Sequence, residues 1–325
     1  MTYEKHIEIL KKQNLPIPNS DIYEFDSSPI SDIFQSYFDF SYKAIQKFCA
    51  DFSIKEYFFY FGNTFSSNAG ADCKNNIHVI RVTNALINNL HNQFVENDNL
   101  KDLLLKKSNY KVLQNNISYP IEKLFLQCSL TFTTYHELTH FLHKSNGVLN
   151  FHETPRKCEF DLEKHLFEFD ADLNGAQFVS FYLIELYVRI PKKVNIEPEI
   201  IFSIGTGSLL LTFLLFFNRE FSYDKNIEEF YLKENSHPHS LIRIHYILNH
   251  FYNICSANNI ELDLQKLLNY SFDIVFKFFP YDSYKRFKNI YYEDFDKIDE
   301  YSNFLFGQSI KNKKLLINNI NKLSS

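Results

Sequence analysis

Apolar side chains recur at intervals of three and four through the first 50 residues, which is the spacing of amphipathic helices. The period then changes. Residues 57–61 and 77–82 are short aromatic or β-branched runs, separated by a stretch rich in Gly, Asn and Ser. These runs predict a pair of strands joined by a long loop. From about Asn84 onward the helical spacing returns, so the sequence predicts a mainly α (α+β) fold with a small β-sheet or strand pair.

One apolar stretch is long enough to raise the question of a membrane. Between Glu199 and Arg219 lie nineteen residues without charge, which approaches the length that crosses a bilayer. The first half is only weakly apolar because it contains Ser, Thr and Gly, and the chain has no second run of this length. Two interpretations of residues 200–218 therefore stay open: a helix buried in the core and a segment in contact with a membrane.

Composition narrows the class of protein. No repeat and no Pro-rich or Gly/Ser linker divides the 325 residues, which predicts a single domain over 1–325. A formal charge of −5 argues against a nucleic-acid partner. Five scattered cysteines without a C-x-x-C pair favour a reducing compartment, and the charged start is unlike a secretory signal. We therefore expect a cytoplasmic protein, with inner-membrane association as the alternative.

The strongest chemical signal is the sequence HELTH within a predicted helix over residues 121–145. The apolar stripe of this helix continues through His143, which is expected to point inward together with the two histidines of this motif, His136 and His140. They stand one turn apart and can bind a single cation, with Glu137 beside it, as in the H-E-x-x-H arrangement. There a zinc ion lowers the pKa of a water molecule, and the glutamate moves its proton to the leaving amine. The predicted reaction is peptide-bond hydrolysis; the alternative is a helix with two core or surface histidines.

A catalytic zinc site needs a third protein ligand, and a second predicted helix over residues 161–190 offers one. Glu168 and Asp172 share one face of it, with Ala171 and Gly175 small enough for another helix to approach closely. Paired carboxylates on an inner face repel each other unless a cation or a donor is present. We therefore predict that Glu168 binds zinc and that Asp172 accepts the second N–H of a ligand histidine.

Two neighbours in this helix are expected to lie outside the site. Asp170 points away from Glu168 and should be in solvent, while His165 is interpreted as an ordinary core or surface histidine. The alternative for the whole helix is an acidic first segment that the helix dipole favours.

A third block of interest is NSHPHSLIRI, which opens another predicted helix. His237 or Arg243 could stabilise the oxyanion of the tetrahedral intermediate, or Arg243 could hold a carboxylate of the site. The alternative is a Pro-marked helix start with a surface Arg, and the residue types alone favour it.

Two weaker signals lie elsewhere. Residues 77–82 are a candidate edge strand that could bind an extended peptide. The final residues, KNKKLLINNINKLSS, predict a short basic helix with a solvated face.

Together the three blocks resemble the gluzincin metallopeptidases of the HtpX and CAAX prenyl protease type. Their pattern is H-E-x-x-H, then E-x-x-A-D, then a distal H-P with an Arg five residues after the Pro. The matching positions, in chain order, are His136, Glu137, His140, Glu168, Asp172, His237, Pro238 and Arg243. This resemblance favours a place in the site for His237 and Arg243.

Within that group the chain is most similar to the phage-exclusion Lit peptidases. The likeness covers roughly residues 56–250, which would form a zincin-like helical core between helical regions at 1–55 and 251–325. It implies a Zn²⁺-dependent abortive-infection protease that a phage peptide activates and that cleaves the protein substrate elongation factor Tu.

Two alternatives belong to other classes of protein. The first is a membrane-associated quality-control metalloprotease similar to HtpX, anchored through residues 200–218. The second is a catalytically idle peptidase fold that binds a partner. The presence of Glu137, which a purely structural zinc does not need, argues against the idle fold.

Overall fold

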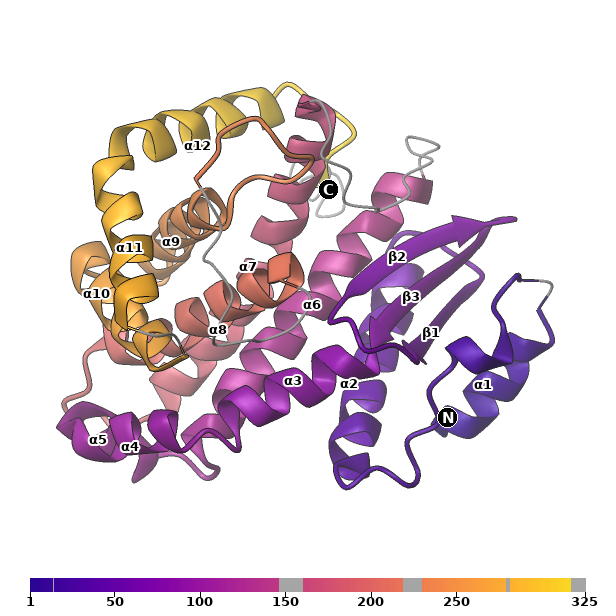
Figure 1. Ribbon diagram of the computed structural model, residues 1–325, viewed down its shortest axis with the longest axis horizontal. Helices are drawn as coiled ribbons and strands as arrows, with labels where there is room; N and C mark the ends of the chain where they lie inside the picture. Colours follow the sequence, from indigo (N-terminus) through magenta and orange to yellow (C-terminus); the bar gives the residue numbers. More distant parts are fainter. Residues whose placement is uncertain (14, 146–159, 219–229, 279–280, 317–325) are drawn as a thin grey trace.

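The computed structural model describes residues 1–13, 15–145, 160–218, 230–278 and 281–316 (Figure 1). The N-terminal elements are α1 (Tyr3–Lys11), η1 (Asn19–Asp21), α2 (Ser31–Asp51), β1 (Tyr57–Gly62), β2 (Ala69–Lys74) and β3 (Ile77–Thr83). The elements that follow are α3 (Asn84–Phe94), α4 (Asp98–Lys106), α5 (Ser108–Gln114), α6 (Ile121–Ser145), α7 (Leu162–Arg189), α8 (Pro198–Asn218), α9 (Ser240–Ala257), α10 (Leu264–Val275), η2 (Phe276–Phe278), α11 (Tyr281–Glu293) and α12 (Phe295–Ser309). This mainly α architecture with a small sheet confirms the predicted fold class.

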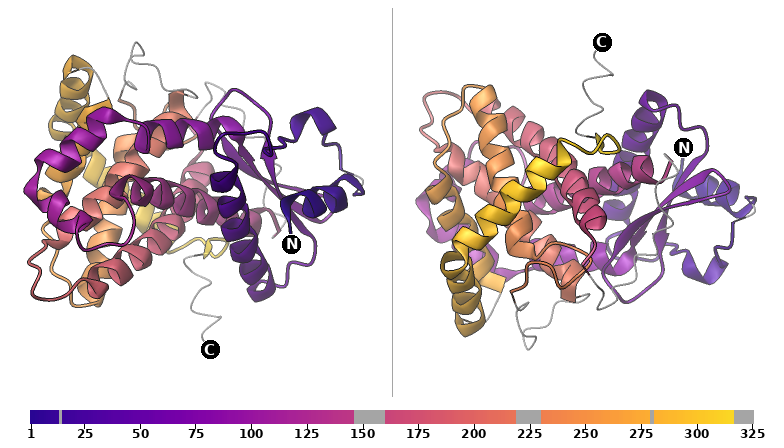
Figure 2. Two further views of the ribbon diagram at one scale, coloured as in Figure 1. Left: turned by 90° about the horizontal axis from the view of Figure 1, so that it is seen from below. Right: turned by 90° about the horizontal axis from the view of Figure 1, so that it is seen from above.

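The sheet has the strand order β1-β3-β2 and lies at one end of the molecule, with α10 and α11 at the other (Figures 1 and 2). Strand β3 runs parallel to β1 and antiparallel to β2, so that Ile80 is the register partner of both Phe59 and Ala71. The two predicted strands are therefore direct neighbours. The prediction that 77–82 is an edge strand is wrong, because β3 is the central strand.

Strand β2 lies within the stretch that the sequence pattern predicts as a loop. Its residues, AGADCK, have small or polar side chains and lack the alternation that marks a strand. A two-residue turn joins it to β3, with φ of 54° at Asn75 and 62° at Asn76. Asn tolerates this left-handed conformation, and a turn with positive φ at both positions matches the twist of a hairpin.

Helices α6 and α7 pack side by side across the middle of the molecule. The Asp161 side chain caps α7 by accepting hydrogen bonds from the backbone N–H groups of Glu163 and Lys164. Gly175 allows the close approach, because a Cβ at this position would lie 2.8 Å from a ring carbon of Phe132 on α6. This contact confirms the close approach predicted for Gly175.

Helix α8 contains the uncharged stretch and packs against α6, α7, α9 and α10. Within it, 94% of the residues in the apolar stretch from Pro198 to Phe216 are buried inside the protein. Its hydroxyl groups are satisfied locally, since Thr212 and Ser208 both donate to backbone carbonyl oxygens one turn earlier. Such packing is that of a core helix, and among the described residues α8 is the one helix apolar and long enough to span a bilayer.

Helix α1 covers the outer edge of β1. The backbone N–H of Phe59 donates to Nε2 of His6 at 3.1 Å, and that of Phe61 donates to the Tyr3 hydroxyl at 3.0 Å. These side chains therefore occupy hydrogen-bonding groups that an edge strand would otherwise expose. Burial lowers the pKa of His6 to about 4, so the ring is neutral and can accept this bond at neutral pH.

We expect His6 to make stability depend on pH. Because its pKa is lower in the folded chain than the ordinary 6.5, the unfolded chain takes up a proton first as the pH falls. The stabilisation is complete above pH 6.5 and is lost towards pH 4, by about 3 kcal/mol. His6→Gln keeps an acceptor for Phe59 but does not titrate, so its free energy of unfolding should fall less over this range. Urea unfolding at several pH values checks this, and parallel pH profiles would contradict it.

Candidate metal centre

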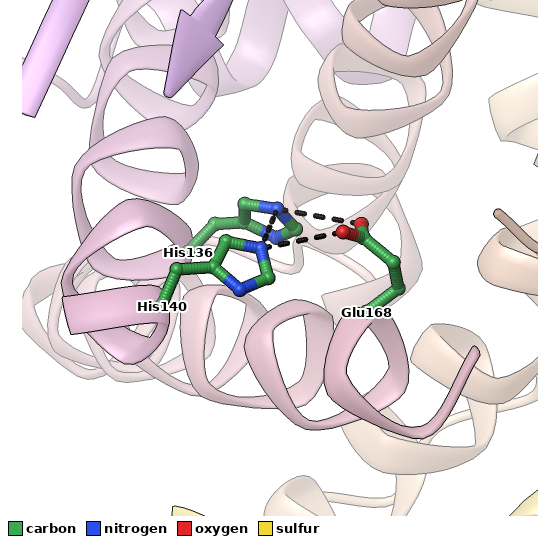
Figure 3. A group of neighbouring side chains, drawn as sticks. All are labelled: His136, His140 and Glu168. Atoms are coloured by element: carbon green, nitrogen blue, oxygen red, sulfur yellow. Dashed lines mark hydrogen bonds and ion pairs between the residues drawn. The ribbon is translucent and has the colours of Figure 1, made fainter. Parts of the chain in front are cut away.

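His136 and His140 lie one turn apart on α6, and both side chains are buried. Their Nε2 atoms are 3.1 Å apart and face α7 (Figure 3). On α7, Glu168 is also buried, with Oε1 3.3 Å from His140 Nε2 and Oε2 3.6 Å from His136 Nε2. Two helices thus bring two imidazoles and one carboxylate to a single point.

The spacing of these ligand atoms suits a metal ion. Donors about 2.1 Å from a tetrahedral ion lie about 3.4 Å from one another, which is close to the three distances observed here. The donor set, two His and one Glu, is that of zinc peptidases with an open fourth position. The group His136, His140 and Glu168 can therefore hold a metal ion.

Asp172 lies one turn after Glu168 on α7 and is fully buried. Its Oδ1 is 3.0 Å from Nδ1 of His136, the ring nitrogen that faces away from the ligand cluster. A histidine that donates Nδ1–H to a carboxylate presents Nε2 to a metal in a fixed orientation. Asp172 therefore lies close enough to His136 to act as the predicted acceptor.

Arg243 on α9 forms a two-pronged ion pair with Asp172. Its Nε and one terminal nitrogen donate to the two carboxylate oxygens at 2.7 and 2.6 Å. The same terminal nitrogen is 3.5 Å from Oε2 of Glu168, and the guanidinium carbon lies 4.0 Å from the ring centre of Phe213 on α8. The Tyr246 hydroxyl also donates to Asp172. Of the alternatives for Arg243, the structure shows a guanidinium that holds a carboxylate of the cluster.

The buried charges shift the pKa values of the cluster. Burial raises the pKa of Asp172, but Arg243 and His136 together outweigh burial, so the net shift is downward and the carboxylate stays ionised. Burial acts in the same direction on Glu168, where His237 and His140 lower the pKa well below its ordinary value. Burial lowers the pKa of His140 to about 3, which leaves it neutral as metal binding requires.

His136 shows the opposite balance. Burial lowers its pKa, but the neighbouring carboxylates of Asp172 and Glu168 outweigh this and raise the pKa above its ordinary value. Two carboxylates and one guanidinium leave one negative charge, which a proton on His136 balances when no metal ion is bound. A buried site of this charge favours a cation.

The two remaining predicted residues lie beside the cluster. His237 precedes α9, with Nε2 3.4 Å from Oε1 of Glu168, and its side chain is 43% exposed. It therefore stands on the solvent side of the buried carboxylate. Glu137 follows His136 on α6 and is buried.

The sequence analysis misplaced one side chain of this region, Asp170, and gave no role to another, His143. The prediction that Asp170 lies in solvent is wrong, because Asp170 is buried and accepts from His143 at 2.8 Å. The helical position of Asp170 places it away from Glu168, but a third packed segment covers that face. His165 is a core histidine as interpreted, bonded to the Asn235 carbonyl and the Tyr301 hydroxyl. The sequence feature that indicated the burial of His143 was its position in the inward-facing stripe of α6.

Comparisons of the chain with protein-family models, with curated proteins and with solved structures found no match. The residues of the cluster and their geometry are therefore the features of this chain that point to a function.

We expect Asp172→Asn to weaken the affinity for Zn²⁺ about 10- to 100-fold, because His136 loses the carboxylate that orients it. Competition with a chromophoric chelator measures this affinity. Glu185→Gln, on an exposed position of the same helix, is the control and should bind zinc like the wild type. Equal affinity in the Asp172 variant would show that this carboxylate does not support the metal ligand.

Proposed function

We propose that this protein is a zinc-dependent endopeptidase. The observation that carries the proposal is the convergence of His136 Nε2, His140 Nε2 and the Glu168 carboxylate at distances that fit a tetrahedral ion. The placement of Glu137 directly after His136 in H-E-x-x-H adds the one residue that catalysis needs and that metal binding alone does not.

Each side chain of the site has a separate role in the proposed reaction. Bound zinc would supply an electrophile that activates water and polarises the carbonyl of the scissile bond. Glu137 is the general base that accepts the proton of the attacking water and returns it to the leaving amine. Arg243 and Asp172 fix the direction of His136, and Arg243 also lies near Glu168. His237, at the exposed side of Glu168, is in a position to donate to the oxyanion.

The substrate is proposed from the sequence resemblance. A chain similar to the phage-exclusion peptidases would cleave elongation factor Tu in the cytoplasm once a phage peptide activates it. A protease with an abundant host substrate must be held inactive until such a signal arrives. The burial of α8 supports this assignment over a membrane-anchored quality-control protease, since α8 is the candidate anchor in the described residues.

The first test is the metal content of the purified protein. Wild-type protein isolated without chelator should contain about one zinc per chain by elemental analysis, and Glu168→Ala should show a clear loss. Glu185→Ala, exposed on the same helix, should retain the metal. Wild-type protein without zinc would refute the proposal, and zinc retained in the Glu168 variant would mean that another residue is the third ligand.

A second variant separates catalysis from metal binding. Glu137→Gln should keep its zinc yet lose about 100-fold or more in the rate of cleavage of elongation factor Tu with the activating phage peptide present. His140→Ala should lose both zinc and cleavage. Mass spectrometry of the products measures the rate. A Gln variant with wild-type activity would contradict the role of Glu137, and cleavage of unfolded casein but not of elongation factor Tu would reject that substrate alone.

A further inference from the structure

The second ligand histidine has a different support from the first. Nδ1 of His140 faces away from the ligand cluster and lies 3.3 Å from Nδ1 of His143, one turn later on α6. The other ring nitrogen of His143, Nε2, lies 2.8 Å from Oδ2 of Asp170 on α7. Both His143 and Asp170 are buried, so this line of polar groups runs through the interior.

The line ends at the backbone near the C-terminal end of the chain. The N–H of Leu316 donates to the same Oδ2 of Asp170 at 2.6 Å. The prediction of a basic helix is wrong for residues 311–316, which form turns, and residues 317–325 lie outside the described part. Leu315 and Leu316 are buried, and Lys314 pairs with Glu163 at the start of α7. In Figure 1 this segment returns from α12 to the beginning of α7.

The groups at the two ends of this line of polar groups determine which ring nitrogen of each histidine carries the hydrogen atom. If Nε2 of His140 binds a metal, its Nδ1 carries the hydrogen and donates to Nδ1 of His143. His143 must then carry its own hydrogen on Nε2, which donates to Asp170. The Leu316 N–H supplies a further donor to that carboxylate. Every bond in the line thus has one donor and one acceptor with both rings neutral.

We infer that His143, Asp170 and the backbone N–H of Leu316 form a positioning relay for the metal ligand His140, so that the segment 310–316 supports the metal centre. The inference rests on the proposed metal site. It differs from a purely structural role of the same contacts, which would stabilise the fold without changing the affinity for metal.

The first pair of variants tests the middle of the relay. His143→Leu removes the acceptor for His140, whereas His143→Asn keeps an oxygen near the place of Nδ1. We expect the Leu variant to lose about 10- to 100-fold in Zn²⁺ affinity and the Asn variant to recover a large part of it. Chelator competition measures the affinity, and the unfolding midpoint in excess EDTA measures the stability of the metal-free fold. His6→Gln, a buried histidine on α1, is the control.

The second pair tests the C-terminal end. Leu316→Pro removes the N–H that donates to Asp170, and Leu316→Ala removes the buried side chain but keeps the N–H. We expect the Pro variant to bind Zn²⁺ several-fold more weakly than the Ala variant. Equal affinities would remove the segment 310–316 from the relay.

The outcomes separate this inference from the proposed function. Wild-type protein that binds no zinc would overturn both. Wild-type protein that binds zinc, together with Leu and Asn variants of His143 that bind it equally tightly and differ only in unfolding midpoint in EDTA, would overturn the relay and leave the zinc peptidase proposal intact.

Discussion

The buried ion pair between Asp172 and Arg243 is the interaction on which the geometry of the cluster depends. It joins α7 to α9, and through His136 it reaches α6, so three helices meet at one carboxylate. A buried pair of this kind adds little net stability, but loss of one partner leaves an unpaired charge and costs about 3–5 kcal/mol. The pair therefore fixes the relative positions of the helices and contributes little to the free energy of unfolding. Phe213 on α8 covers the guanidinium and keeps water away from it.

The helical part of this arrangement could be predicted from the chain. The three-and-four spacing placed His136 and His140 on the inner face of a helix whose observed bounds, Ile121–Ser145, match the prediction. The same reasoning placed Glu168 and Asp172 on one face of α7, and Gly175 indicated the close approach of the two helices. Such inferences succeed because they depend on positions within one helix, where a fixed period relates sequence to direction in space.

What could not be predicted depends on contacts between distant segments. The burial of Asp170 follows from the segment 310–316, which nothing in the local pattern places over α7. The partner of Arg243 lies 71 residues away, so the sequence left several roles open. Strand β2 has no apolar alternation, although Asn75 and Asn76 are a recognisable hairpin turn. The central position of β3 comes from its pairing with both β1 and β2. Backbone groups make these hydrogen bonds, so the side chains of β3 do not show that both of its edges are paired.

The ion pair and the Leu316 contact also determine when, during synthesis of the chain, the cluster can be completed. All three candidate metal ligands have been made by residue 168, while Arg243 and Leu316 follow 71 and 146 residues after the carboxylates they contact. A chain still on the ribosome therefore carries the ligands without the cation that neutralises Asp172. The contacts of Asp172 with Arg243 and of Asp170 with Leu316 can therefore both be present only after residue 316 has been made.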